Sequence, residues 1–143
     1  MRGGTANVTV ILSDDRISSP YLKVYDTAII LNQQSMDKFE DSVKPGGVLI
    51  YDPNGISHHP TRTDIAIYQI EGNRLATEMG NKKIFNMVIL GGFLKKKPIV
   101  KIENVIAGLK KSLSERYHHL IPLNEKAIHV GMQNIHPYKN LVN

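Results

Sequence analysis

Apolar runs of strand length recur along the chain, with amphipathic stretches between and after them. Each run is rich in β-branched residues and is bounded by turn-forming residues, which favours β-strands. The predicted strands span residues 7–12, 26–31, 48–51 and 65–70. Residues 26–31 and 48–51 contain short continuous apolar stretches, as is typical of strands that are covered on both faces.

Helical spacing of apolar residues marks the amphipathic stretches. Met36, Phe39 and Val43 fall on one helix face behind Asn32, which is a favourable N-cap residue. The sequence Lys44-Pro45-Gly46-Gly47 is expected to end this helix. Further helices are predicted at residues 73–79, 84–93, 102–113 and 124–131, with Gly80 closing the first of them, and residues 136–143 are expected to be irregular.

The order of these elements predicts an α/β fold with a mainly parallel sheet. The strand, helix and strand within residues 26–51 are joined by short loops, which implies a parallel crossover. Residues 84–93 are apolar almost all round, so a helix buried in the middle of the domain is expected, and Gly91-Gly92 would permit close packing against another backbone. At 143 residues the chain is expected to form a single domain, residues 1–143.

Composition narrows the function classes. The chain has no cysteine, so it cannot ligate an iron–sulfur cluster, form a disulfide or use a thiol nucleophile. The N-terminus carries no apolar signal segment, and the longest apolar run, residues 87–94, is far shorter than the roughly 20 residues that cross a bilayer. A net charge of +5, with three phenylalanines and no tryptophan, argues against nucleic-acid binding because no aromatic platform is available for bases. We expect a cytoplasmic protein that contacts neither membrane nor nucleic acid.

Few residues have the pattern of a metal or catalytic site. The pairs His58-His59 and His118-His119 are the metal candidates, but adjacent side chains diverge, and no carboxylate stands three or four residues after His118 or His119. Solvated imidazoles are therefore favoured over metal ligands. Neither a nucleophile-elbow nor a phosphate-loop pattern occurs in the sequence.

The segment Arg2-Gly3-Gly4-Thr5 is a candidate binding element. Two glycines beside an arginine let the backbone approach an anionic group that the guanidinium can pair, and the alternative is a frayed terminus. Asn86 is the other anomaly, since it interrupts an apolar helix and a buried amide must find a partner. We expect Asn86 to be buried and hydrogen-bonded to backbone across the helix–sheet interface.

Five segments of the chain resemble one known family in their order and spacing. They are Met1-Arg2-Gly3-Gly4-Thr5-Ala6-Asn7, Leu31-Asn32-Gln33, residues 44–51, residues 86–91 and residues 123–127. Together they resemble the gamma subunit of 2-oxoacid:ferredoxin (flavodoxin) oxidoreductases of the pyruvate, 2-oxoglutarate and ketoisovalerate types. The resemblance covers nearly the whole chain and implies a Rossmann-like three-layer α/β/α sandwich.

The resemblance also implies a function. Such a complex oxidatively decarboxylates a 2-oxoacid, with 2-oxoglutarate favoured here, to an acyl-CoA and passes electrons to ferredoxin. Thiamine diphosphate and iron–sulfur clusters would lie on the alpha, beta and ferredoxin-like partners, and the gamma subunit would assist coenzyme A access and assembly. The isolated chain would bind none of these cofactors alone and would be inactive, with no catalytic or metal-binding residue of its own. The candidate ligand or partner contacts are Arg2, Gly3, Gly4, Thr5, Asn7, Asn32, Gln33 and Asn86.

The beginning of the chain departs from the family. Family members start with a strand and a Gly-rich loop before the Arg-Gly-Gly segment, and this sequence opens on that segment. An N-terminally truncated sandwich would leave the sheet and the helix at residues 84–93 uncovered, so we expect the isolated chain to be a homo-oligomer. A free-standing Rossmann-like binding protein and a self-associating interaction protein without catalysis are the alternatives.

Overall fold

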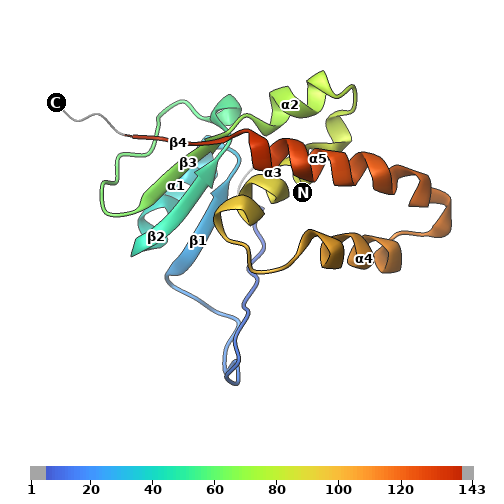
Figure 1. Ribbon diagram of the computed structural model, residues 1–143. Helices are drawn as coiled ribbons and strands as arrows, with labels where there is room; N and C mark the ends of the chain where they lie inside the picture. The colour runs from blue at the N-terminus through green and yellow to red at the C-terminus, as the bar shows by residue number, and fades with distance from the viewer. Residues whose placement is uncertain (1–5, 140–143) are drawn as a thin grey trace.

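A four-stranded sheet, in the order β1-β2-β3-β4, forms the centre of the computed structural model, which describes residues 6–139 (Figure 1). The strands are β1 (Tyr25–Ile30), β2 (Val43–Tyr51), β3 (Ala66–Ile70) and β4 (Ile135–Pro137). Strands β1, β2 and β3 are parallel, and β4 runs antiparallel to β3. The predicted parallel crossover between the first two strands is confirmed, as is the mainly parallel sheet.

The described residues form five α-helices. They are α1 (Gln33–Phe39), α2 (Gly72–Glu78), α3 (Phe85–Lys96), α4 (Ile102–Ser112) and α5 (Ile121–Gln133), with short 3-10 helices at Glu40–Ser42, Pro53–Gly55, Lys82–Ile84 and Glu115–Leu120. Asn32 caps α1 as predicted, because its Oδ1 accepts a hydrogen bond from the Ser35 N–H at 2.8 Å. Within residues 6–139, no helix has both the length and the apolar character to cross a membrane.

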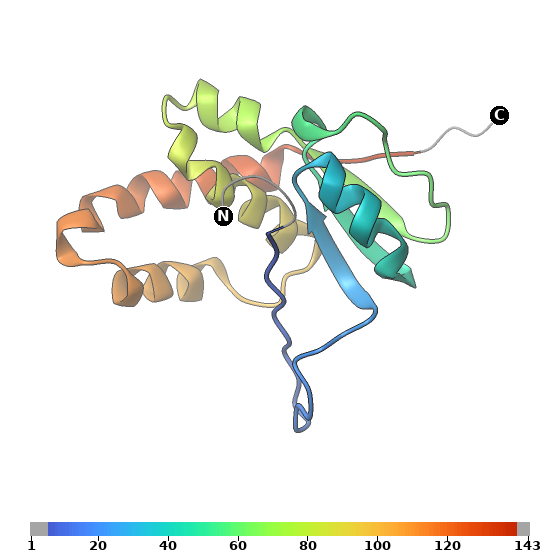
Figure 2. The same cartoon turned by 180° about the vertical axis from the view of Figure 1, so that it is seen from behind.

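The sheet lies between two helical layers. Leu49 and Tyr51 belong to the core on the side of α1, where Met36 is also buried, whereas Ile50 belongs to the core beneath α3 and α5. Successive residues of a strand point to opposite faces, so β2 fills both cores. Figure 2 shows α1 in front of the sheet and α3 with α5 behind it. The predicted three-layer α/β/α architecture is confirmed.

The predicted strand at residues 7–12 is wrong. Val8, Val10 and Leu12 are 87%, 76% and 67% exposed, and no strand among residues 6–139 pairs with this segment. A β-branched pattern stabilises a strand only where a neighbouring strand supplies hydrogen bonds and packing. Residues 6–24 instead form an extended arm that projects from the molecule before β1 begins (Figures 1 and 2).

The predicted end of the first helix is also wrong. Helix α1 ends at Phe39, and Val43 begins β2, where it is 1% exposed. The sequence expected to stop a helix, residues 44–47, therefore lies inside β2, and Gly46 adopts a φ of 79° where the register with β1 shifts. Val43 fits the helical spacing of Met36 and Phe39 although it belongs to β2, because Met36 and Val43 are buried in the same core.

The C-terminal residues are not wholly irregular as predicted. Strand β4 places Ile135 beside Ile70, and Ile135 is 7% exposed. A three-residue strand with one buried side chain is too short to show the alternation of apolar and polar residues by which strands are predicted from a sequence.

The buried helix expected at residues 84–93 is confirmed as α3, and the expectation that an N-terminal truncation leaves this helix uncovered is wrong. Val88, Ile89 and Leu94 are all buried, because α5 packs along α3 over the sheet. The exposed large apolar residues lie instead on the arm, on and just after β1 at the edge of the sheet, and before and after α4.

Candidate functional site

A cleft of about 290 Å³ opens where β1 and β2 end. Its walls come from Leu31 after β1, from Asp52 and the Pro53–Gly55 turn after β2, and from the segments at the starts of α2 and α3. Parallel strands end at the same edge of a sheet, and that edge is where open α/β folds bind ligands. This carboxyl-edge cleft is therefore the candidate functional site.

Asp52 joins two walls of the carboxyl-edge cleft. Its side chain is 2% exposed, its Oδ1 accepts a hydrogen bond from the Asn54 N–H at 2.9 Å, and its Oδ2 accepts one from the Asn73 N–H at 2.9 Å. One carboxylate thus fixes both the turn after β2 and the first turn of α2. Asp52 was not among the predicted site residues. The available signal was an Asp directly after a buried strand, followed by Pro-Asn-Gly, which is typical of a side-chain-stabilised turn.

Asn32 and Gln33, two of the predicted contacts, lie beside this cleft and hold neighbouring backbone. The Gln33 Oε1 accepts hydrogen bonds from the N–H groups of Ser57 and His58, each at 2.8 Å, and its Nε2 donates to Asp37 at 2.8 Å. Asn32 caps α1 through its side chain. Both are positioning residues, because these side-chain hydrogen bonds connect Asn32 to the first turn of α1 and Gln33 to the loop after β2.

Lys82 is the cationic group of the carboxyl-edge cleft. It is exposed, and none of the ion pairs among residues 6–139 involves it. Asn54, Asn73 and the ring of Phe85 also line the cleft. An ammonium group with amides and an aromatic ring suits an anionic ligand that also carries an apolar or flat part. Lys82 was not among the predicted site residues.

Asn86 does not make the contact that was predicted for it. The residue is exposed, and its Oδ1 accepts a hydrogen bond from the Met87 N–H at 3.0 Å. Because α3 begins at Phe85, Asn86 lies in the first turn of the helix, where backbone N–H groups have no helical acceptor. Its amide therefore serves the helix terminus, and the expected bond across the helix–sheet interface is wrong.

Among the remaining predicted contacts, the structure describes Asn7, which does not line the carboxyl-edge cleft. Asn7 lies on the arm and is exposed. Arg2, Gly3, Gly4 and Thr5 lie outside the described residues.

A buried polar cluster on the α1 side of the sheet was not predicted. Tyr51 is fully buried, and its hydroxyl accepts a hydrogen bond from the Gln69 Nε2 at 2.6 Å and lies 2.8 Å from the His59 Nδ1. The ring of Tyr138 stacks on His59 with centroids 5.2 Å apart. Burial raises the pKa of Tyr51 to about 12, so the phenol keeps its proton at neutral pH and has a hydrogen available for the imidazole. The cluster ties the segments around His59 and Tyr138 to the sheet.

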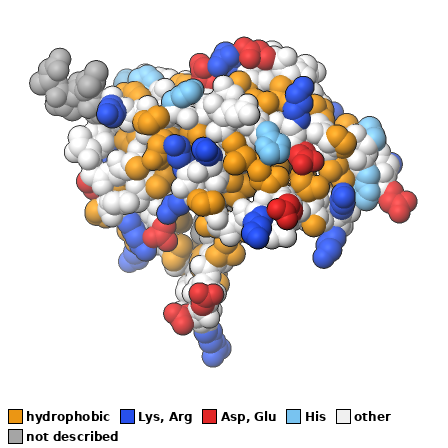
Figure 3. All heavy atoms as spheres, in the orientation of Figure 1, with side chains coloured by type: hydrophobic (Ala, Val, Ile, Leu, Met, Phe, Trp, Pro, Cys, Tyr) orange, Lys and Arg blue, Asp and Glu red, His pale blue; other side chains and the backbone are white. Residues whose placement is uncertain are grey.

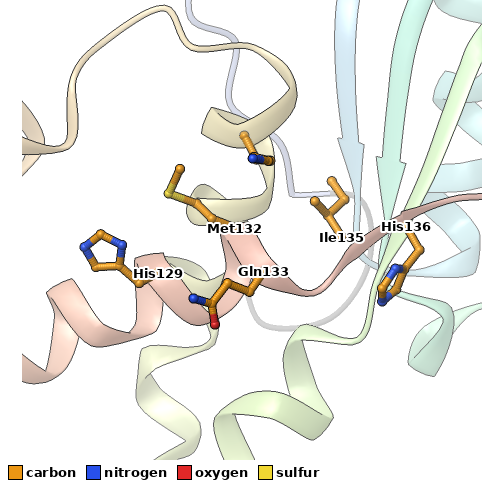
Figure 4. Close-up of a pocket in the computed structure, with 6 residues that line it drawn as sticks. His129, Met132, Gln133, Ile135 and His136 are labelled. Carbon is orange, nitrogen blue, oxygen red and sulfur yellow. The ribbon is translucent and has the colours of Figure 1, made fainter.

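A second cavity, of about 490 Å³, lies between the end of α3, the end of α5 and β4 (Figure 4). It is lined by Lys95, His129, Met132, Gln133, Ile135 and His136. Figure 4 shows the two imidazoles on opposite sides of Met132 and Ile135, so they do not converge on one point. None of the predicted contacts within residues 6–139 lines this cavity. Nowhere in residues 6–139 do three or more potential metal-binding side chains gather.

Comparison with known proteins gives one family. Residues 1–134 match the family model described as pyruvate ferredoxin/flavodoxin oxidoreductase. The 2-oxoglutarate synthase subunit KorC of Methanocaldococcus jannaschii is 33% identical over 106 residues, which are 73% of this chain and 57% of that protein. The ketoisovalerate oxidoreductase subunit VorA of Methanothermobacter thermautotrophicus is 32% identical over 90 residues, which are 63% of this chain and 18% of that protein. This chain therefore spans little more than half of one relative and less than a fifth of the other.

Solved structures share the fold. The gamma subunit of a keto/oxoacid ferredoxin oxidoreductase from Geobacter sulfurreducens aligns with a TM-score of 0.70 and 21% identity, over 85% of this chain and 66% of that one. The 2-oxoglutarate:ferredoxin oxidoreductase from Magnetococcus marinus, solved with 2-oxoglutarate, coenzyme A and succinyl-CoA, aligns with a TM-score of 0.67 and 21% identity, over 85% of this chain and 21% of that one. The resemblance to gamma subunits that the sequence motifs carry is confirmed. The chain belongs to the pyruvate ferredoxin/flavodoxin oxidoreductase family.

Proposed function

We propose that this chain acts in a complex that oxidatively decarboxylates a 2-oxoacid, with 2-oxoglutarate favoured, to an acyl-CoA and passes the electrons to ferredoxin. The family supports the reaction type, and the names of the 2-oxoglutarate relatives support the substrate. The chain has no cysteine, so the iron–sulfur clusters must be ligated by partner chains. Thiamine diphosphate is assigned to those partners as well.

The role of this chain in the complex is to assist coenzyme A access and assembly. The observation that supports a coenzyme A contact is the carboxyl-edge cleft, where Lys82 has no carboxylate partner among the described residues and the Phe85 ring lies in the same wall. Coenzyme A carries phosphates that an ammonium can pair and an adenine that can lie against an aromatic ring. Asp52 would hold this wall in place without touching the ligand.

Reconstitution tests the complex. Co-expression with thiamine diphosphate-binding and iron–sulfur subunits is expected to yield a copurifying assembly that reduces ferredoxin in the presence of 2-oxoglutarate and coenzyme A. The isolated chain is expected to show no turnover, because it cannot carry the clusters. Turnover by the isolated chain, or failure to bind the thiamine diphosphate-binding subunit, would overturn the proposal.

Neighbouring lysines test the cleft. Lys82→Ala in the assembled complex should raise the apparent KM for coenzyme A about tenfold or more with little change in kcat, since a charge-assisted bond is worth about 1.5–3 kcal/mol. Lys83→Ala removes the same charge from the next residue, which does not line the cleft, and should leave the KM unchanged. Equal effects of the two substitutions on the KM would show that coenzyme A responds to the general positive charge of this surface and not to a specific contact with Lys82.

A further inference from the structure

Helix α4 is the most weakly covered long helix of the described residues. It is strongly amphipathic, yet it has no buried residue, whereas α3 and α5 each bury several. The apolar row Ile102, Val105, Ile106 and Leu109 is only half-buried. Helix α5 is the main neighbour of α4, so one side of the row has no partner helix.

Exposed apolar residues adjoin this row. Ile99 and Val100, just before α4, are 55% and 42% exposed, and Tyr117, after it, is 41% exposed. Figure 3 shows hydrophobic side chains gathered between α5 and α4 on one face of the molecule. Exposed apolar side chains gathered in this way mark an interaction surface more often than a solvated one. We call the α4 row and the adjoining residues 99–100 and 117 the α4 face.

The charges on α4 specify how a partner can lie against it. Glu103 and Lys110 are seven residues apart, so they lie on the same flank of the helix, beside Ile106 and about 10 Å apart along its axis. Both side chains are exposed, and neither takes part in the ion pairs of residues 6–139. The flank therefore has an acid toward the helix N-terminus and a base toward the C-terminus.

This arrangement is complementary to itself. When two copies of α4 lie antiparallel about a two-fold axis between residues 106 and 107, equal flanks face each other, and Glu103 of each copy meets Lys110 of the other. The contact is isologous and closes as a dimer. A parallel pair would instead bring each lysine to the height of the same lysine.

We propose that the α4 face is the interface with a second copy of this chain, with the two α4 helices antiparallel and joined by two Glu103–Lys110 pairs. The partner copy covers the apolar row, and the charge pairs set the direction. The proposal concerns the chain alone and stands whether or not the proposed coenzyme A role is correct.

Charge reversal at the two flank positions tests the proposal by sedimentation equilibrium at low salt, where screening is weak. The wild-type chain should form a dimer. Glu103→Lys and Lys110→Glu should each weaken dimerisation about tenfold or more, because two attractive pairs become two repulsive ones. A mixture of the two variants should recover association as a heterodimer, since each acid again meets a base. Both residues are exposed, so circular dichroism should show an unchanged fold.

Lys111→Glu is the matched control. It makes the same charge change one residue further along α4, on the side away from Ile106, and should leave the dimer intact. The apolar arm, residues 6–24, can also drive association, but only an α4 interface makes the mixture associate more tightly than either variant alone. A wild-type monomer at several hundred micromolar, or a mixture no tighter than its components, would overturn the proposal.

Discussion

The pair of helices α3 and α5 and the single helix α4 use glycine in opposite ways. A Cβ on Gly91 would collide with the carbonyl oxygen of Ile128 in α5, and a Cβ on Gly131 would collide with that of Val88 in α3. A Cβ on Gly108 in α4 would meet nothing within 4 Å. The same residue type therefore permits backbone contact in one region and only weakens the helix in the other.

This difference explains what holds each region in place. Helices α3 and α5 touch through their backbones, so their relative position is fixed by atoms that cannot rotate away, and Val88 and Ile128 are fully buried around the crossing. Helix α4 is held by half-buried side chains alone. Substitutions in the first region should therefore act on the whole fold, and substitutions in α4 should act locally.

The largest effect is expected at the α3–α5 crossing. Gly91→Ala and Gly131→Ala should each lower the free energy of unfolding by about 3 kcal/mol or more, because a backbone carbonyl must move to make room. Gly92→Ala is the matched control, since its Cβ would meet the end of the flexible Ile70 side chain at 2.6 Å, and it should cost much less. Urea unfolding measures all three, and equal losses at Gly91 and Gly92 would contradict the backbone contact.

Asp52 connects the sheet to α2, which packs against α3, so it belongs to the firmly held region. Asp52→Ala should lower the free energy of unfolding by about 2 kcal/mol, because the N–H groups of Asn54 and Asn73 lose their acceptor. Asp37→Ala removes an exposed carboxylate that accepts a hydrogen bond from the Gln33 side chain, and it should change stability by less than about 0.5 kcal/mol. A thermal unfolding series that ranked the two variants equally would contradict the positioning role of Asp52.

The buried cluster around Tyr51 should make the free energy of unfolding depend on pH. The pKa of Tyr51 is about 12 in the folded chain, compared with 10.0 for an unperturbed tyrosine. Above pH 10 the unfolded chain loses this proton before the folded chain does, so stability should fall by about 1 kcal/mol between pH 9 and pH 11. Tyr51→Phe should abolish this part of the fall, and the difference between the two denaturation curves removes the contribution of the lysines. Parallel curves for the two proteins would show that the phenol is not buried.

Several elements were predictable because their patterns are local. The strands at residues 26–31 and 65–70 match β1 and β3 within one residue, the strand at 48–51 matches the second half of β2, and all five helices were located. The close backbone approach predicted at Gly91-Gly92 is confirmed at Gly91, although the sequence did not name α5 as its partner.

The errors concern features that depend on distant neighbours. Residues 7–12 have the composition of a strand but no described strand beside them, and Ile135 pairs with a strand about 65 residues away without any pattern of its own. The cleft follows the same rule. Asn32 was identifiable from the sequence as a local helix cap. Asp52 and Lys82 come together only because the end of β2 lies near the starts of α2 and α3 in the fold.

The smallest effect is expected at Gly108 in α4. Gly108→Ala should stabilise the helix by about 0.5–1 kcal/mol, because alanine restricts the unfolded backbone and meets no atom within 4 Å in the folded one. Since α4 is held only by half-buried side chains, it should open without global unfolding, and the gain should appear as about two- to fivefold slower hydrogen exchange of the α4 amides. The amides of α3 and α5, which share the backbone contact at Gly91 and Gly131, should exchange at unchanged rates. Equal slowing in all three helices would mean that α4 unfolds together with the core, and the contrast between the two regions would then be lost.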